Sequence, residues 1–289
     1  MGGPRRRTRG FRWTPDDAPA AAAVETGVHE ARKLLKRVRA LLAFVRPVVG
    51  AEATDAFDAR ARDVGRRLSG TRDGAARVAA LDRACGGHDG VPARFEGLRA
   101  ALLAARDART EAFLRSDDVA LAVDALQALA DDLRALALPA DGLKRWDRGL
   151  RRLIRRGRAS LDAAAASPDD AHAHAVRRRW KQLGYVLRWL APACPDLMGP
   201  YARALETALT ALGDDHDQVV LRARLERGVD GAAPEVLAEA LEGSIAYGER
   251  RRAGALEALA RLAAEPAKAF VARQRAYVAH GRGAGRDGC

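Results

Sequence analysis

Three segments of the sequence place basic side chains at the spacing of one helix face. In the first basic stripe they stand at offsets 0, 3, 4, 7, 8 and 10: His29, Arg32, Lys33, Lys36, Arg37 and Arg39. The second basic stripe repeats all six offsets: Arg148, Arg151, Arg152, Arg155, Arg156 and Arg158. The third basic stripe has the first four offsets, and two further residues extend its face: His174, Arg177, Arg178, Lys181, Tyr185 and Arg188. At about 100° per residue, the six offsets cover roughly 160° of a helix surface.

Stripes of one charge sign indicate an anionic partner. Like charges four residues apart repel by a few tenths of a kcal/mol per pair, and an anionic ligand or a neighbouring anionic helix would offset that repulsion. Arginine suits phosphate because its guanidinium group can bond two phosphate oxygens at once. For any single stripe the alternative is an ordinary solvated helix face. Two stripes with identical offsets favour a phosphate-rich ligand.

The histidines His29 and His174 stand at the edge of their stripes. Each imidazole could donate a hydrogen bond to phosphate, more strongly when it is protonated. Because a bound polyanion favours protonation, we expect tighter binding at mildly acid pH. The alternative is a structural histidine that is bonded to a neighbouring helix.

The composition permits a polyanionic partner and excludes several classes of protein. The 289 residues carry 50 basic and 38 acidic side chains, a formal net charge of +12, and all but five of the basic residues are arginine. A hydrophobic content of 48% is too high for a disordered chain. No uncharged apolar stretch reaches the ~18 residues of a membrane-spanning helix, and no secretory signal is expected at the Arg-rich start. A coding bias that raises Arg, Ala and Gly together is the alternative explanation of the charge.

Apolar residues recur three and four positions apart along almost the whole chain, which predicts an all-α protein. The expected helices span residues 16–46, 51–69, 72–85, 92–114, 117–137, 141–166, 169–191, 196–212, 215–228, 234–263 and 266–280. We expect Pro47 to end the first helix, and a short turn near Gly213 to separate two later helices. Opposite the first basic stripe, apolar residues predict one buried helix face: Val28, Ala31, Leu34, Leu35, Val38, Leu41 and Leu42.

An internal repeat relates the two halves of the chain. Asp73 follows His29 by 44 residues, and Asp217 follows His174 by 43 residues. In each copy a His-led basic helix precedes a second helix, a short turn and a third helix that the aspartate would cap. The chain is therefore interpreted as a duplicated helical hairpin unit.

These motifs resemble those of the CHAD family, the conserved histidine α-helical domain. The matching segments are the first and third basic stripes, residues 149–158, and the turns at Arg72-Asp73 and His216-Asp217, so that the resemblance spans roughly residues 11–280. It implies two four-helix bundles related by a pseudo-twofold axis, whose basic helices line a central groove or pore that binds inorganic polyphosphate. It also implies a cytoplasmic protein, in some members at polyphosphate granules. Gln182 and Gly184 depart from the basic pattern, and Gly184 is expected to mark a close approach of two helices.

We therefore expect residues 1–15 to form a flexible Arg-rich arm, 16–138 a first bundle, 139–280 a second bundle and 281–289 a flexible tail. The expected function is polyphosphate binding by all residues of the three basic stripes, without enzymatic activity, cofactor, metal or membrane. Cys85, Cys194 and Cys289 form no CxxC pair, so neither a zinc site nor a disulfide framework is expected.

Two alternatives stay open. One is a nucleic-acid-binding helical protein, in which nucleic acid would compete with polyphosphate; an aromatic content of 5% disfavours single strands, which bind by base stacking. The other is a metal-dependent polyphosphate or triphosphate hydrolase, although the sequence contains no complete set of catalytic or metal-ligating residues.

Overall fold

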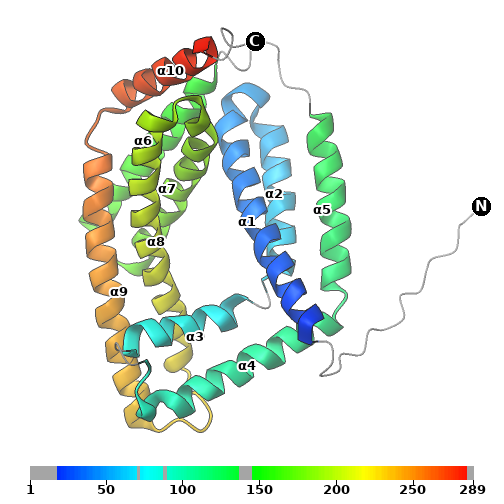
Figure 1. Ribbon diagram of the computed structural model, residues 1–289, viewed down its shortest axis with the longest axis vertical. Helices are drawn as coiled ribbons and strands as arrows, with labels where there is room; N and C mark the ends of the chain where they lie inside the picture. The colour runs from blue at the N-terminus through cyan, green and yellow to red at the C-terminus, as the bar shows by residue number, and fades with distance from the viewer. Residues whose placement is uncertain (1–17, 70–71, 87–89, 137–144, 285–289) are drawn as a thin grey trace, which may run out of the picture.

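The computed structural model describes residues 18–69, 72–86, 90–136 and 145–284, which form α-helices joined by short connections (Figure 1). The helix bounds are α1 Ala18–Val49, α2 Ala51–Arg67, α3 Arg72–Cys85, α4 Glu96–Arg115, α5 Asp118–Ala135, α6 Trp146–Ala166, α7 Asp170–Leu190, α8 Pro195–Leu225, α9 Pro234–Leu262 and α10 Ala267–Ala284. Single 3-10 turns, Ala93–Phe95 and Ala191–Ala193, precede α4 and α8. The described residues contain no β-strand, so the prediction of an all-α protein is confirmed.

The end of α1 differs from the prediction. The helix continues through Pro47 and ends at Val49. A proline lacks the N–H that bonds to the preceding turn, but Pro47 stands so close to the helix end that only the last turn loses a hydrogen bond. Gly50, with a φ of 103°, then turns the chain into α2.

The predicted turn near Gly213 is also wrong, because α8 is one continuous helix through this segment. A Cβ atom on Gly213 would lie 3.3 Å from Nη2 of Arg177, so this glycine makes room for a guanidinium group within a helix. Asp217 consequently caps no helix and instead forms an ion pair with Arg83, at 3.3 Å. The internal repeat is therefore imperfect: the first copy breaks between α2 and α3, and the second does not.

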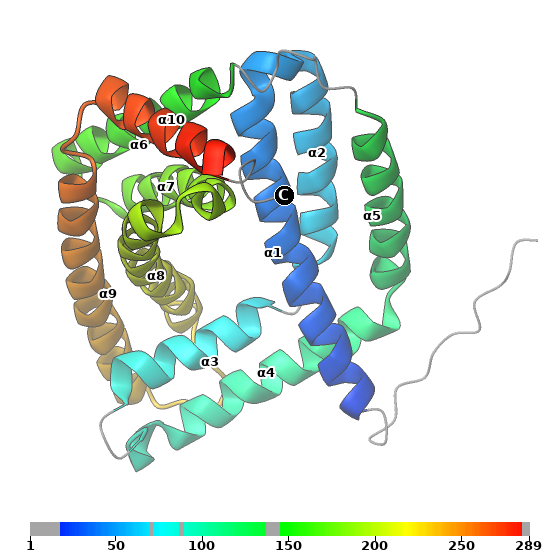
Figure 2. The same ribbon diagram turned by 45° about the horizontal axis from the view of Figure 1, so that its top comes forward.

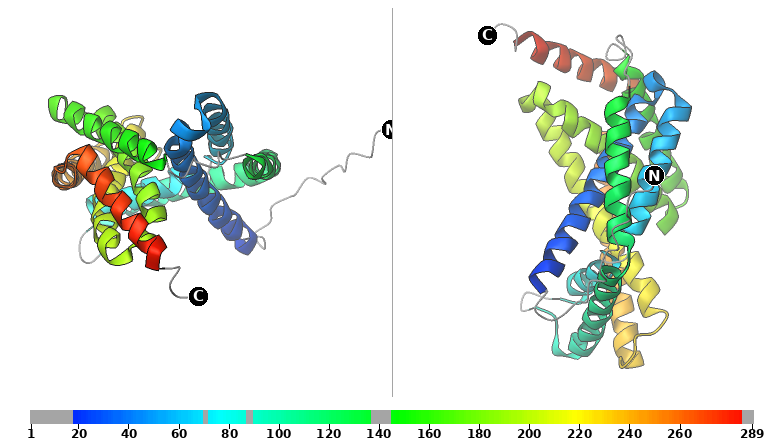
Figure 3. Two further views of the ribbon diagram at one scale, coloured as in Figure 1. Left: turned by 90° about the horizontal axis from the view of Figure 1, so that it is seen from above. Right: turned by 90° about the vertical axis from the view of Figure 1, so that its right-hand side faces the viewer.

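The helices surround α1 on several sides. In Figures 1 and 2, α2 lies beside α1 and α5 lies beyond α2, α6 to α9 stand on the opposite side of α1, and α3 and α4 cross at the lower end. The two views of Figure 3 confirm that α2 and α5 occupy the same side of α1. The helix α1 packs directly against α2, α6 and α7. It therefore joins the first part of the chain to the second.

Three apolar clusters hold this arrangement together. The first packs α6 to α10 around Trp180, which has no exposed surface, and it includes Phe44 of α1. The second joins α3 and α4 to α8 and α9 around Leu81 and Leu221, and the third lies among α1, α2, α4 and α5. The second cluster therefore contains side chains from both halves of the chain. The predicted boundary near residue 138 lies outside the described residues, and the pseudo-twofold pair of bundles stays a prediction.

The predicted apolar face of α1 is buried only in part, and Ala40 and Phe44 are buried outside it. Val28, Leu35 and Leu42, spaced by seven residues, are 6%, 3% and 4% exposed, whereas Leu34 is 55% exposed. A seven-residue spacing returns to nearly the same side of a helix, so one packing interface buries these three residues and leaves Leu34 at its edge.

Two glycines allow helices to approach closely. A Cβ atom on Gly149 of α6 would lie 1.9 Å from the carbonyl oxygen of Phe44 in α1. A Cβ atom on Gly184 of α7 would lie 3.3 Å from Cδ1 of Leu209 in α8, which confirms the close approach expected there. The contact at Gly149 matters most, because the neighbouring atom belongs to the backbone and cannot rotate away.

The substitution Gly149→Ala should separate α6 from α1. We expect the free energy of unfolding to fall by about 1–3 kcal/mol, the usual cost of overpacking a core, measured by chemical denaturation. Gly254→Ala on α9 is the matched control, because nothing lies within 4 Å of a Cβ atom there. The control should be neutral or stabilising by up to ~1 kcal/mol, from the better helix propensity of alanine. Equal effects of the two substitutions would contradict the close approach.

Candidate functional site

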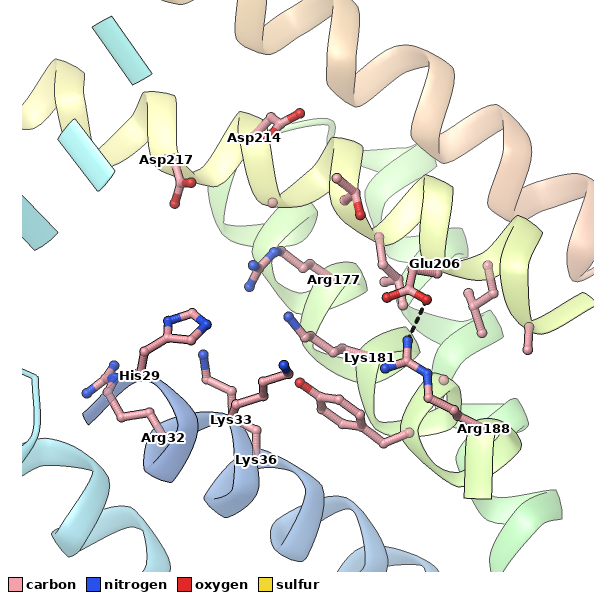
Figure 4. Close-up of a pocket in the computed structure, with 17 residues that line it drawn as sticks. His29, Arg32, Lys33, Lys36, Arg177, Lys181, Arg188, Glu206, Asp214 and Asp217 are labelled. Atoms are coloured by element: carbon pink, nitrogen blue, oxygen red, sulfur yellow. Dashed lines mark ion pairs between the residues drawn. The ribbon is translucent and has the colours of Figure 1, made fainter. Parts of the chain in front are cut away.

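The strongest candidate site is a cavity of about 320 Å³ between α1, α7 and α8, called here the α1/α7 cavity. Its basic and hydroxyl side chains come from the first and third basic stripes: His29, Arg32, Lys33, Lys36, Arg177, Lys181, Tyr185 and Arg188. Figure 4 shows Lys33 and Lys36 of α1 pointing across the cavity toward Arg177 and Lys181 of α7. The structure therefore brings together cations that lie about 150 residues apart in the sequence.

The face of α7 that lines the cavity follows from helix geometry. Arg177, Lys181, Gly184, Tyr185 and Arg188 all line it, and they fall within about 100° of one helix face. The Lys181 Nζ atom lies 5.9 Å from the centre of the Tyr185 ring, in a cation–π contact. Burial raises the pKa of the Tyr185 hydroxyl, although nearby arginines act in the opposite direction. The hydroxyl therefore keeps its proton and can donate to an anion.

Acidic side chains from α8 also line the cavity, and arginines accompany them. Glu206 Oε2 lies 2.7 Å from Nη2 of Arg188, in the ion pair drawn in Figure 4. Asp214 pairs at 2.8 Å with Arg251 of α9, which does not line the cavity. Asp217 pairs in the same way with Arg83 of α3. Because Asp214 and Asp217 are neutralised from outside, the cations of α1 and α7 dominate the interior.

Residues of α1 outside the cavity, or at its edge, have other contacts. Arg32 donates a hydrogen bond of 2.6 Å to the carbonyl oxygen of Gly65, which fixes its guanidinium against α2. Arg39 pairs with Asp58 at 2.7 Å and does not line the α1/α7 cavity. Arg37 does not line it either, although its charge lowers the pKa of the Tyr185 hydroxyl against the effect of burial.

The second basic stripe is divided among several environments. Arg148 and Arg155 are exposed and line none of the cavities found in the described residues. Arg151 lies 3.8 Å from Asp147 on its own helix, and Arg158 donates to the carbonyl oxygen of Glu265 at 2.8 Å. A stripe 160° wide cannot face a single neighbour, because α6 packs against α1, α7 and α10 on different sides.

The remaining members of this stripe, Arg152 and Arg156, line a separate cavity of about 190 Å³ between α1, α2, α6 and α7, called here the arginine pocket. Arg39 of the first stripe and Arg178 of the third stripe also line it. Sequence reasoning missed Arg46, Arg62 and Arg179, the other arginines of this pocket. For Arg179 the available signal was the run of three arginines that ends there.

His174 does not line the α1/α7 cavity. Its ring lies against that of His216, with the ring centres 4.6 Å apart and the planes inclined by 43°. Burial lowers the pKa of His174, and the charges of Arg177 and Arg178 lower it further. Of the two histidines that the sequence singled out, His29 alone lines the cavity.

The lowered pKa of His174 makes stability depend on pH. Between that pKa and the ordinary value of 6.5, the unfolded chain binds more protons than the folded protein. The free energy of unfolding therefore rises with pH through this window and falls on acidification. We expect His174→Gln to reduce the loss of melting temperature between about pH 7.5 and about pH 5.5. His280→Gln, at an exposed position of α10, is the control, and an equal pH dependence in the two variants would contradict the assignment.

Comparisons with known proteins give a match to a family model. A family model described as the CHAD domain matches residues 12–226, which include α1 to α8 and end before α9, whereas the motifs suggest a resemblance that reaches residue 280. A search of curated proteins and a search of solved structures found no match. Among the described residues, no helix is both long and apolar enough to cross a membrane. The family model covers most of the chain, and the protein therefore belongs to the CHAD domain family.

Proposed function

We propose that the protein binds inorganic polyphosphate in the α1/α7 cavity. One observation carries this proposal: cations from two helices distant in the sequence face each other across one cavity. Membership of the CHAD family supports the same ligand, because the family is associated with polyphosphate and triphosphate. The proposal includes a cytoplasmic location, at polyphosphate granules where these form.

The cations would hold successive phosphate units from two sides. Lys33 and Lys36 project from α1, and Arg177 and Lys181 project from α7. The guanidinium of Arg177 can bond two oxygens of one phosphate, whereas the lysines act as point charges that tolerate a flexible chain. Much of the affinity would come from the release of counterions, so binding should weaken as the salt concentration rises.

The shape of the cavity favours a thin chain over nucleic acid. A volume of about 320 Å³ between packed helices suits a single strand of phosphates, whereas a DNA duplex presents its phosphates on the outside of a wide cylinder. Tyr185 and the imidazole of His29 are the aromatic side chains among the lining residues in the described part of the chain, and Tyr185 already packs against Lys181. The cavity therefore offers little surface on which bases could stack.

The substitution Arg177→Gln should weaken binding of long polyphosphate by about tenfold or more, because a hydrogen-bonded pair of charges is worth ~1.5–3 kcal/mol. Arg155→Gln is the matched control: it removes the same charge from an exposed position outside the described cavities. We expect the control to change affinity by less than about twofold, since a distant surface charge is largely screened. Isothermal titration calorimetry measures both dissociation constants. If Arg155→Gln weakened binding as much as Arg177→Gln, the cavity would not be the site.

Competition between ligands tests the class of ligand directly. Long polyphosphate, duplex DNA and single-stranded RNA are titrated at about 150 mM salt, a physiological ionic strength, and phosphate release is followed in parallel. We expect polyphosphate to displace both nucleic acids, without phosphate release. A preference for DNA would replace the proposal by nucleic-acid binding, and metal-dependent release of phosphate would replace it by hydrolysis.

Removal of the carboxylate beside Arg188 should strengthen the binding of polyphosphate. Glu206→Gln frees the Arg188 guanidinium and removes a negative charge from the cavity wall. We expect long polyphosphate to bind several-fold more tightly. The gain in affinity is limited because the Glu206–Arg188 ion pair is partly solvated. Glu257→Gln, which removes an exposed partner of Arg261 on α9, should leave the dissociation constant unchanged. An unchanged or weaker affinity in Glu206→Gln would show that the polyanion does not reach Arg188.

A further inference from the structure

The arginine pocket lies apart from the α1/α7 cavity. The two share no lining residue. On α7, Arg178, Arg179 and Gln182 line the arginine pocket, and they point about 130° away from the face that lines the α1/α7 cavity. On α1, the stretch from Arg39 to Arg46 lines it, roughly 15 Å further along the helix than the stretch around Arg32. The pocket is therefore a separate concave site.

On one wall of the pocket, two aspartates pair with three arginines. Asp58 lies 2.7 Å from Arg39 and 3.1 Å from Arg62. Asp55 pairs with Arg46, and hydrogen bonding to Arg46 lowers the pKa of Asp55. These two aspartates are the acidic residues that line the pocket among the described residues, and α1 and α2 supply both partners of each pair.

The described residues of the opposite wall are four arginines and a glutamine, without a carboxylate. Arg152 and Arg156 of α6, with Arg178 and Arg179 of α7, line it, and none of the four forms an ion pair within the described part of the chain. Burial lowers the pKa of Arg179, and the charges of Arg156, Arg178 and Arg152 lower it further. Burial and the charge of the neighbouring Arg156 likewise lower the pKa of Arg152. Four cations are thus gathered on this wall. Asp55 partly offsets the charge of Arg152, but it already pairs with Arg46.

The size and lining of the pocket restrict the ligand. Its volume of about 190 Å³ is below the ~300–1,000 Å³ of ordinary small-molecule sites. No aromatic side chain lines it among the described residues, so a nucleobase would have nothing to stack on. Several guanidinium groups around a small space match the oxygens of a tetrahedral oxyanion, which they can bond in pairs.

We propose that the arginine pocket is a second anion site, which binds one or two phosphate groups through Arg152, Arg156, Arg178 and Arg179. Two sources supply this chemistry. One is free orthophosphate or pyrophosphate. The other is the end of a polyphosphate chain held in the α1/α7 cavity, because a shallow cavity lined by Arg32, Lys36, Arg39 and Arg62 lies between the two sites and shares residues with both. The inference rests on the pocket itself and does not depend on the proposed function.

Pyrophosphate is the probe for the test, in a buffer free of phosphate. The variant Lys36→Gln/Lys181→Gln removes two cations of the α1/α7 cavity. It should lose affinity for long polyphosphate and still bind pyrophosphate, within about threefold of the original protein by calorimetry. Addition of Arg156→Gln/Arg179→Gln should weaken pyrophosphate binding by about tenfold or more. Addition of Arg109→Gln/Arg250→Gln instead removes two exposed arginines outside the described cavities. This control should not weaken pyrophosphate binding.

The outcomes separate this inference from the proposed function. If pyrophosphate affinity does not respond to Arg156→Gln/Arg179→Gln, the second site is refuted, whatever happens to long polyphosphate. If long polyphosphate binding survives Lys36→Gln/Lys181→Gln, the proposed function is refuted and the second site is untouched. Prior saturation with long polyphosphate distinguishes the source: blocked pyrophosphate binding identifies a chain end in the pocket, and unchanged binding identifies a free anion.

A purely structural role for these arginines predicts a different result. Removal of two cations that repel each other should leave the melting temperature of the anion-free protein unchanged or raise it, whereas loss of structural contacts would lower it. Added pyrophosphate should then stabilise the original protein and not the variant. Should Arg156→Gln/Arg179→Gln fail to fold, Arg156→Lys/Arg179→Lys keeps the charge and loses the bidentate geometry. Its pyrophosphate affinity should fall several-fold, and an unchanged affinity would overturn the site.

Discussion

The fold must hold two cationic helices, α1 and α7, side by side against their mutual repulsion. Apolar packing behind the charges achieves this. Trp180, Leu183 and Val186 of α7 have no exposed surface, and burial of each such side chain stabilises the fold by about 1.5–3 kcal/mol. Repulsion between neighbouring surface cations costs only a few tenths of a kcal/mol per pair. The core can therefore keep the basic faces together, and their remaining repulsion favours an anion.

The acidic residues of α8 lie where arginines of neighbouring helices can pair with them. Asp215, 2% exposed, pairs with Arg252 of α9, which also contacts Asp170 at the start of α7. Burial raises the pKa of Asp215, and the hydrogen bond from Arg252 opposes that rise. Beside this pair, Gln218 donates to the carbonyl oxygen of Ala80 at 3.0 Å and so joins α8 to α3. Arginines of α9 and α3 thus pair with Asp214, Asp215 and Asp217 of α8, and Glu206 pairs with Arg188 of α7.

The basic stripes serve two cavities because helices have several neighbours. On α7, Lys181 faces one cavity and Arg178, only three residues away, faces the other. On α1 the division runs along the helix axis, between Lys36 and Arg39. Each cavity therefore combines residues from stripes that are remote in the sequence. The same division explains why Arg148 and Arg155 reach neither cavity, since they lie on the side of α6 that no described helix covers.

Local sequence determined the all-α class, most helix bounds, the basic stripes and the family, because apolar spacing and charge spacing act within a few turns of helix. It misjudged Gly213, since a glycine that ends a helix and one that admits an arginine from another helix look alike along a single chain. Only the tertiary structure decided which members of each stripe meet. A basic face 160° wide fits several possible neighbours, and the close contacts at Gly149 and Gly184 select among them. Those contacts join residues far apart in the sequence, so no local pattern could reveal the arginine pocket.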